Sequence, residues 1–288
     1  MKTDIYAIVT QQIIEILEQG AGDWEHYLTE AARAGNVARN AEGRAYTGIN
    51  AISLAFARAR HGYKSHRWAT FKQVKAKGGQ VLKGSKGMPV LFFSVVDKKS
   101  DDLSEESRYA IARYYTVFNF DQTTLVDDSA PVDETPKTIA GCAGDFVGID
   151  ITHSNTNSAF YSPAMDRITM PNLDLWKSEG HYFSTLVHEC SHWTGHKSRL
   201  NRDFASRFFT YQYAMEELVA ELATCFFAAA TNTEFHSQRN SAAYLGHWLT
   251  KAKEDSKALV TVASKAQKAC ELLLKHYKPA VMTGAMAG

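Results

Sequence analysis

Residues 185–200, TLVHECSHWTGHKSRL, place two histidines four positions apart, with a glutamate directly after the first. On an α-helix, residues i and i+4 lie on one face about a turn apart, so His188 and His192 can reach a single ion. Glu189 can hydrogen-bond a water molecule on that ion. The stretch therefore predicts a metal-binding helix, and the rest of the sequence must supply a further ligand.

The same stretch has the features of a well-formed helix over residues 178–195. Ser178 can cap its first turn, apolar side chains follow at helical spacing, and Gly195 can end it. The alternative is a chance match in an ordinary helix, which is expected in roughly a few per cent of shuffled sequences of this composition. The helical setting lowers that chance further, so a metal site is favoured.

A catalytic site of this type needs three protein ligands. One arrangement extends the pattern to HExxHxxGxxH. Gly195 stands where that pattern has its glycine, but Ser198 occupies the ligand position and His196 is out of phase. This arrangement therefore fails here.

The other arrangement takes a glutamate from a second helix. Residues 213–227, YAMEELVAELATCFF, combine an apolar stripe with three glutamates. We predict Glu217 as the third ligand and Glu221 as the acceptor for the second ring nitrogen of a ligand histidine. Glu216 is the competing ligand. The alternative for these glutamates is an exposed, solvated face of the helix.

Two imidazoles and one carboxylate suit zinc, so one Zn²⁺ per chain is expected, with another divalent transition metal as the alternative. Glu189 would then be the general base of a peptidase-type reaction. The strand predicted from DRITMPNL, residues 166–173, is expected to be an edge strand that pairs with an extended peptide. The candidates for stabilising an oxyanion, each with packing or surface as its alternative, are Tyr211, Tyr213 and His196.

Charge is distributed unevenly along the chain. The formal net charge is +1, yet residues 33–86 hold twelve lysines and arginines and a single acid, Glu42, which gives this basic segment +11 and the remainder −10. Such an asymmetry favours binding to a polyanion. The alternative is a solvated basic face whose aromatic side chains belong to the core.

Cations and aromatic rings are interleaved in this basic segment. Phosphates need cations, and unpaired bases need flat apolar rings to stack on. No helix-turn-helix or zinc finger is recognisable, so single-stranded DNA is favoured over a duplex. For Trp68 and Phe71 the alternative is a place in the core. The predicted DNA contacts are Arg44, Tyr46, Lys64, Arg67, Trp68, Phe71, Lys72, Lys75, Lys77, Lys83 and Lys86.

The expected elements define an α+β chain with two domains. Residues 1–121 mix helices and strands, and QVLKGSKGMPVLFFSVVD is expected to form a β-hairpin by itself. Residues 122–138 are acidic, contain two prolines and are predicted to be a linker. The domain over residues 139–288 is expected to be mostly helical, with helices over 178–195, 211–229, 240–254 and 257–277.

The composition is that of a soluble globular chain. No apolar run approaches the roughly 18 residues of a membrane helix. The N-terminal helix carries acidic residues and lacks a cleavage site, so it is not a signal peptide. The four cysteines lie far apart and suit a reducing compartment. A cytoplasmic location without a membrane partner is expected.

Considered together, these features resemble the ArdC-type plasmid antirestriction proteins. GRAYTGINAISL, WATFKQVKAKGGQVLKGSKG and YYTVFNFDQ are similar to that family's N-terminal single-stranded-DNA-binding domain, which also occurs in plasmid primases of the TraC type. LVHECSHWTGHKSRLNRD with YAMEELVAEL resembles its C-terminal zincin-like metallopeptidase domain. The resemblance implies His188 and His192 as ligands, Glu189 as the base and a glutamate of EELVAE as the third ligand.

The resemblance also implies a protein of a mobile element that shields incoming DNA from host restriction. Single-stranded DNA is the expected partner, and a host protein such as a restriction enzyme component is a further candidate. A purely DNA-binding module with a structural or vestigial metal site is the alternative. An intact Glu189 favours the enzyme, because a structural site needs no base beside its ligands. A primase or nuclease fragment is disfavoured, since no acidic cluster for nucleotidyl transfer is recognisable.

Overall fold

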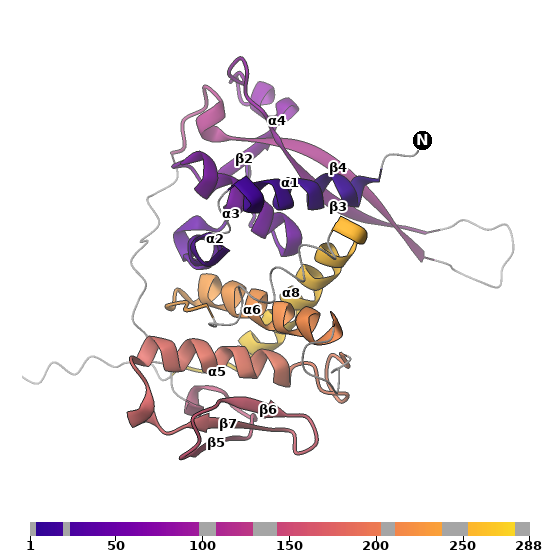
Figure 1. The fold of residues 1–288 in the computed structure, drawn as a ribbon. Helices are drawn as coiled ribbons and strands as arrows, with labels where there is room; N and C mark the ends of the chain where they lie inside the picture. Colours follow the sequence, from indigo (N-terminus) through magenta and orange to yellow (C-terminus); the bar gives the residue numbers. More distant parts are fainter. Residues whose placement is uncertain are drawn as a thin grey trace, which may run out of the picture. The chain divides into compact units, whose positions relative to one another are not determined.

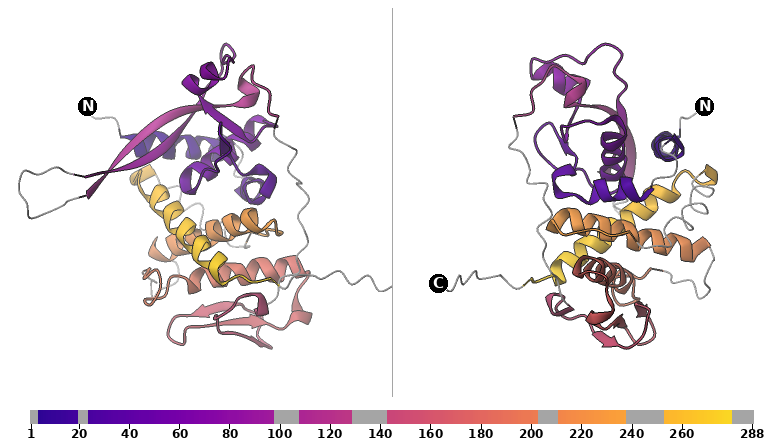
Figure 2. Two further views of the ribbon diagram at one scale, coloured as in Figure 1. Left: turned by 180° about the vertical axis from the view of Figure 1, so that it is seen from behind. Right: turned by 60° about the vertical axis from the view of Figure 1, so that its left-hand side comes forward.

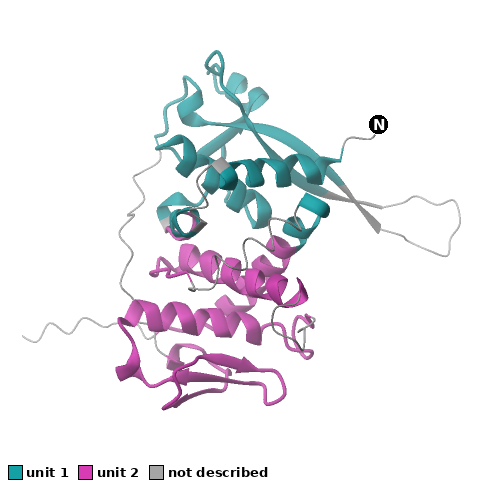
Figure 3. Cartoon of the chain, in the orientation of Figure 1, with its two compact units in different colours: residues 1–30, 35–132, 249–261 teal, residues 31–34, 133–248, 262–288 magenta. Residues whose placement is uncertain are grey.

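The structure is a computed structural model that describes residues 4–19, 24–97, 108–128, 143–202, 211–237 and 253–279. The chain divides into two compact units (Figure 3). Unit 1 comprises residues 1–30, 35–132 and 249–261, and unit 2 comprises residues 31–34, 133–248 and 262–288. Residues 249–261 thus cluster with the N-terminal unit, whereas the sequence analysis assigned them to the second domain. The predicted linker lies largely outside the described residues.

Unit 1 contains a four-stranded sheet in the order β1-β2-β4-β3. Its strands are β1 (Arg39–Asn40), β2 (Arg67–Thr70), β3 (Met88–Asp97) and β4 (Arg108–Asn119). β1 runs parallel to β2, and the other neighbours are antiparallel. β3 and β4 form a long hairpin (Figure 1). With the helices of both units, this confirms the α+β class.

The predicted partner of β3 is wrong. The sequence predicted that it pairs with the short apolar run around Val81, but Val81 forms only an isolated bridge to Thr123. β3 instead pairs with β4 along its whole length, from Met88 opposite Val117 to Asp97 opposite Arg108. The longer ladder satisfies many more backbone donors and acceptors than a short strand before the turn could.

Four helices belong largely to unit 1: α1 (Ile5–Gln19), α2 (Trp24–Ala32), α3 (Gly48–His61) and α4 (Phe71–Ala76). The apolar faces of α1 and α3 supply much of its core, including Ile13, Leu17 and Phe56. Asn50 of α3 also holds the edge of the sheet: its side chain accepts from the Leu91 amide at 2.8 Å and donates to the Leu91 carbonyl at 2.7 Å. The edge strand is therefore partly capped by a side chain.

Unit 2 combines a three-stranded sheet with long helices. Its elements are β5 (Ile151–Ser154), β6 (Phe160–Ser162), β7 (Arg167–Pro171), α5 (Glu179–Trp193), α6 (Tyr211–Thr231) and α8 (Ala258–His276), and the division at residue 261 falls inside α8. α5 lies between α6 and the sheet (Figures 1 and 2). The helices predicted over residues 178–195, 211–229 and 257–277 are confirmed as α5, α6 and α8. The helix predicted over 240–254 falls almost wholly outside the described residues.

Short 3₁₀ turns complete the described elements: η1 (Ala34–Asn36), η2 (Phe120–Gln122), η3 (Ala143–Asp145) and η4 (Leu173–Leu175). The core of unit 2 is a cluster of aromatic rings that includes Phe146, Phe183, Phe227 and Tyr277. Their ring centroids lie 5.0 to 6.3 Å apart. Offset and edge-on aromatic contacts at these distances stabilise a core beyond the area that they bury. No described helix is long and apolar enough to cross a bilayer.

The strand before the metal-binding helix is not an edge strand. β7 is the centre of its sheet, since β5 pairs with it in parallel and β6 pairs with it antiparallel. The predicted role of DRITMPNL in pairing with a peptide is therefore wrong, because both sides of its backbone are already hydrogen-bonded. Among the described residues β5 and β6 each pair with β7 alone, so both are edges of this sheet.

Trp68 is a core residue of unit 1. Its side chain is 0% exposed, and Tyr63 makes an edge-on contact with its ring at 5.9 Å between centroids. The prediction that Trp68 stacks on a DNA base is therefore wrong, because no base can reach the ring. Phe71, three residues further along the chain, is 58% exposed and stays available.

We predict that Trp68→Ala lowers the free energy of unfolding by about 3–5 kcal/mol, because it removes a fully buried indole. Phe71→Ala, a matched change at an exposed ring, should stay within about 0.5 kcal/mol of the unchanged protein. Denaturant unfolding followed by circular dichroism measures both. Equal stability of the two variants would contradict the burial of Trp68.

Candidate metal centre

Helix α5 carries the two histidines on a rigid, well-capped element. The Ser178 hydroxyl accepts a hydrogen bond from the His181 amide at 3.2 Å, which satisfies one of the free donors at the helix start. The helix ends at Trp193, close to the predicted end. Its apolar face is buried, with Leu186 and Cys190 fully inside the core.

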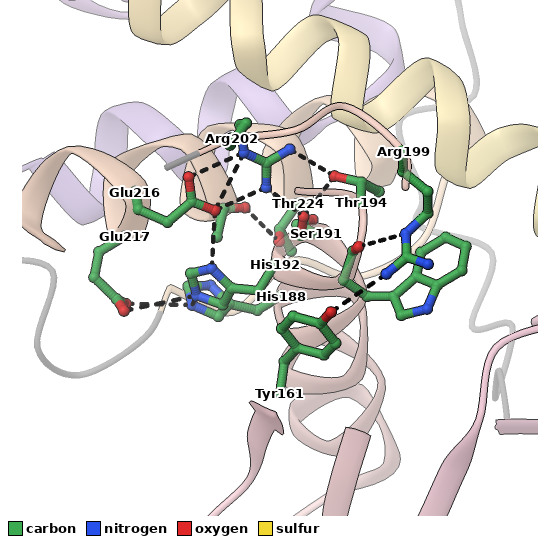
Figure 4. A network of polar contacts seen from close by, with 12 residues as sticks. Tyr161, His188, Ser191, His192, Thr194, Arg199, Arg202, Glu216, Glu217 and Thr224 are labelled. Atoms are coloured by element: carbon green, nitrogen blue, oxygen red, sulfur yellow. Dashed lines mark hydrogen bonds and ion pairs between the residues drawn. The ribbon is translucent and has the colours of Figure 1, made fainter. Parts of the chain in front are cut away.

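Helix α6 packs against α5 and turns three glutamates toward the histidines. Leu218 and Leu222 form part of the apolar stripe that holds the helix in place. Figure 4 shows Glu217 and Glu216 extending from α6 to His188 and His192 on α5. On each helix the residues at i and i+4 lie on one face, and the two faces are turned toward each other. Side chains from α5 and α6 therefore meet at one point.

The ligand atoms of His188, His192 and Glu217 lie within 4.8 Å of one another. The two Nε2 atoms are 3.2 Å apart. Oε2 of Glu217 is 3.4 Å from Nε2 of His188, and its Oε1 is 3.6 Å from Nε2 of His192. Donors bound about 2.0–2.1 Å from a tetrahedral ion lie about 3.3–3.4 Å apart, so the three groups are spaced as zinc ligands are.

The opposite nitrogen of each imidazole faces a further carboxylate. Nδ1 of His192 lies 3.2 Å from Oε1 of Glu216, and Nδ1 of His188 lies 3.5 Å from Oε2 of Glu221. A carboxylate beside Nδ1 favours the tautomer with its proton there, which leaves the lone pair on Nε2. Two such lone pairs 3.2 Å apart repel each other unless a cation lies between them. The donor set therefore fits a divalent metal ion.

Burial and charge have opposite effects on the pKa values of His188 and Glu217. Burial lowers the pKa of His188, but the carboxylates of Glu217 and Glu221 outweigh it and raise the pKa well above the ordinary value. Burial raises the pKa of Glu217, but hydrogen bonds from His188 and Tyr213 and the charges of both histidines bring it to about 2. The carboxylates around the two imidazoles thus favour a positive charge at this site.

Arg202 fixes Glu216 in place. Its Nε and Nη2 donate to the two Glu216 carboxylate oxygens at 2.9 and 2.7 Å, its Nη1 donates to the Thr194 hydroxyl at 2.7 Å, and its Nη2 also donates to the Ser191 carbonyl at 2.7 Å (Figure 4). Burial raises the pKa of Glu216, but His192 and Arg202 outweigh it and lower the pKa. Glu216 is therefore committed to Arg202 and to Nδ1 of His192, while Glu217 faces both Nε2 atoms.

Of the remaining predicted residues, Glu189 and Tyr213 lie beside the metal ligands, whereas His196 contacts other groups. Glu189 lies on α5 beside His188 and is 8% exposed. Tyr213 hydrogen-bonds Glu217, which ties it to the predicted third ligand. His196 contacts Ser198 through Nδ1 at 2.8 Å and lies 4.0 Å from Asp166, so its described contacts are with other groups. Arg202 was not predicted, because its only signal in the sequence is a charged residue shortly after the helix.

The predicted DNA contacts in unit 1 are nearly all at the surface. Tyr46 and Arg67 are half-buried, and burial raises the pKa of Tyr46 to about 12. Trp68 is the exception, being buried. The exposed members are Arg44, Lys64, Phe71, Lys72, Lys75, Lys77, Lys83 and Lys86. The basic segment therefore places its cations in water, where phosphates can reach them.

Comparison with known proteins defines the class to which this fold and site belong. Residues 144–265 match the family described as a zincin-like metallopeptidase, and residues 3–118 match the N-terminal domain of the anti-restriction factor ArdC. The class is thus an antirestriction protein with a zincin-like second domain. Over 95% of its length the chain is 35% identical to the crystallised antirestriction protein ArdC of plasmid R388, with 98% of that chain covered and a TM-score of 0.77. The chain belongs to the ArdC antirestriction family.

Other relatives extend this picture. The R388 protein has also been crystallised with Mn(II) bound, and that structure matches with 34% identity and a TM-score of 0.75. Protein y4eC of Sinorhizobium fredii is 36% identical over 284 residues, which cover 92% of this chain and 90% of y4eC. The DNA primase TraC of Escherichia coli is 31% identical over 95% of this chain, which spans only 20% of the primase.

We predict that alanine at His188, His192 or Glu217 abolishes stoichiometric metal binding, measured by elemental analysis after dialysis against Zn²⁺ or Mn²⁺. Glu216→Gln keeps all three ligands but weakens the support of His192, so the affinity should fall about 10- to 100-fold. Glu179→Gln, an exposed change in the first turn of α5, is the control. Full metal loss in Glu216→Ala with retention in Glu217→Ala would reverse the assignment.

Proposed function

We propose that this protein shields the single-stranded DNA of a mobile element from host restriction in the cytoplasm, and that its second unit is a metallopeptidase. The convergence of His188, His192 and Glu217 from two helices is the observation that carries the enzymatic part. The exposed cations of the basic segment support DNA binding. A host protein, such as a component of a restriction enzyme, is the proposed substrate.

His188, His192 and Glu217 would hold the ion, with zinc as the proposed metal. When bound, the ion lowers the pKa of a water molecule and polarises a peptide carbonyl. Glu189, adjacent to His188 on α5, takes a proton from the attacking water and passes it to the leaving amine. Glu216 and Glu221 keep the two imidazoles oriented during this transfer.

An extended substrate needs a free strand edge beside these residues. β6 offers one, because β7 occupies only one side of its backbone among the described residues. A peptide added to β6 would gain main-chain hydrogen bonds with little dependence on its sequence. Figure 4 draws Tyr161 of β6 together with the metal centre: Arg199 donates to the Tyr161 hydroxyl at 3.3 Å and to the Trp193 carbonyl, at the end of α5, at 2.7 Å.

The alternative is a DNA-binding protein whose metal site only stabilises the fold. Glu189 distinguishes the two proposals, since a structural site does not use a base. The paired carboxylates behind the histidines are compatible with either. We favour the enzyme because a buried glutamate next to a ligand is costly to keep without a function.

We predict that Glu189→Gln retains the metal and the fold but loses protection of a plasmid transferred into a restricting host. Removal of a general base typically costs 10²- to 10⁴-fold in rate, so protection should approach that of an empty vector. Transfer into a host without restriction is the control and should be unchanged. Full protection by this variant would support the structural alternative instead.

We predict that the affinity for an oligothymidylate falls steeply with salt, because phosphate binding releases counterions, with a slope of about −0.7 per phosphate contacted. The double change Lys72→Glu with Lys75→Glu should weaken binding at low ionic strength and make the slope shallower. Lys265→Glu with Lys268→Glu, an exposed pair of equal spacing on α8, is the control. Fluorescence anisotropy over a salt series measures both, and a salt-independent affinity would remove the phosphate contacts.

A further inference from the structure

Four aromatic rings are exposed on the described part of the β3–β4 hairpin, and two of them, Phe92 and Tyr115, contact each other. Phe92 of β3 is 59% exposed and Tyr115 of β4 is 44% exposed. Both lie beyond the basic segment and were not among the predicted DNA contacts. Exposed aromatic rings that gather on one surface mark binding sites more often than rings scattered singly do.

The strand register places these rings together on one face. Phe92 is opposite Arg113 and Tyr115 is opposite Val90, so alternation puts Phe92, Arg113 and Tyr115 on the same side of the hairpin. The Phe92 and Tyr115 rings touch edge to face, with centroids 6.2 Å apart. Tyr114 (44% exposed) is opposite Leu91 and Phe93 (49% exposed) is opposite Ala112, so these two rings lie on the other side.

Cations flank this pair. Arg113 is exposed beside Phe92. Across the sheet, Thr70 of β2 is opposite Val117, two residues along the strand from Tyr115. Helix α4 begins directly after Thr70 and carries the exposed Lys72 and Lys75. Tyr115 therefore lies just beyond the end of the β2–β4 pairing at which the cationic helix α4 begins.

We propose that Phe92 and Tyr115 form a stacking platform for the bases of single-stranded DNA, with Arg113 beside them as a phosphate contact. This platform supplies the ring stacking that the buried Trp68 cannot. The proposal rests on the DNA binding proposed above and specifies where in unit 1 the bases lie.

The surrounding charge favours a nucleic acid over a protein or a second copy of the chain as the occupant. Arg113 lies beside the platform, and a strand that runs from the platform toward α4 would meet Lys72 and Lys75; each of these cations can neutralise a phosphate. Rings stack on any base, so the platform suits DNA of arbitrary sequence. A second copy would bring the same cations and would be repelled.

The test compares Tyr115→Ala with Tyr114→Ala, which removes an equally exposed ring from the same strand on the opposite face. Stacking on one ring typically supports binding to an extent that corresponds to roughly 5- to 150-fold in affinity. We expect Tyr115→Ala and Phe92→Ala each to weaken oligothymidylate binding by this factor at constant salt slope. Tyr114→Ala should bind as the unchanged protein does, and thermal unfolding should confirm that all variants are folded.

An abasic oligomer of deoxyribose phosphate separates stacking from charge. The unchanged protein and Tyr115→Ala should bind it equally, because it offers no base. If the unchanged protein binds oligothymidylate and Tyr115→Ala binds it just as tightly, the platform is overturned while DNA binding stands. If the unchanged protein binds neither oligomer, the proposed DNA binding itself fails. A change in oligomeric state of Tyr115→Ala, measured by sedimentation, would identify a contact between copies and overturn the platform.

Discussion

The contact between three carboxylates of α6 and two imidazoles of α5 is the constraint around which unit 2 is organised. Removing a carboxylate from water costs several kcal/mol unless the charge is paired and hydrogen-bonded. Glu216 and Glu221 are both buried, and each has its own compensation. Glu216 is matched by Arg202, and Oε1 of Glu221 accepts from the Ser237 hydroxyl at 2.6 Å. Such a site is stable only if both helices keep one fixed axial register.

The packing around the site supplies that register. Leucines of both helices and the aromatic cluster fix α5 against α6. Arg202 then links the end of α5, through the Ser191 carbonyl and the Thr194 hydroxyl, to Glu216 on α6. An arginine suits this place because its planar fork can address a carboxylate and two further acceptors together, which a lysine cannot. Apolar contacts thus set the distance between the helices, and the guanidinium sets their alignment.

The parts of this site that follow from helical periodicity could be predicted from the sequence. The pair His188 and His192 has the i, i+4 spacing, and so has the pair Glu217 and Glu221, so each pair could be placed on one face before the structure was known. Arg202 could not be found in this way, because it lies in a connection after the helix and meets its partner fourteen residues later. Its role depends on how the connection folds, which no local pattern records.

The errors on the β-strands have a common physical cause. The hydrogen-bonded partners of a helical residue lie about one turn away in the sequence. The partners of a strand residue belong to another strand, which can lie far away in the sequence. β5 and β6 are four and three residues long, too short for an alternating pattern to reveal them beside β7. Trp68 lies on a four-residue strand whose two central side chains are both buried, so its exposure could not be read from alternation.

The same reasoning explains why the proposed DNA surface is divided in the sequence. The cations form one continuous segment because exposed charge needs no partner and can accumulate along the chain. Exposed rings need a rigid support if they are to remain apart and receive a base, and a long paired hairpin provides it. Pairing of β4 with β2 on one side and with β3 on the other brings Tyr115 near the cationic helix and Phe92 near Tyr115. A surface of this kind is assembled by strand register, so a search for basic and aromatic residues within one window of sequence finds the charges and misses the rings.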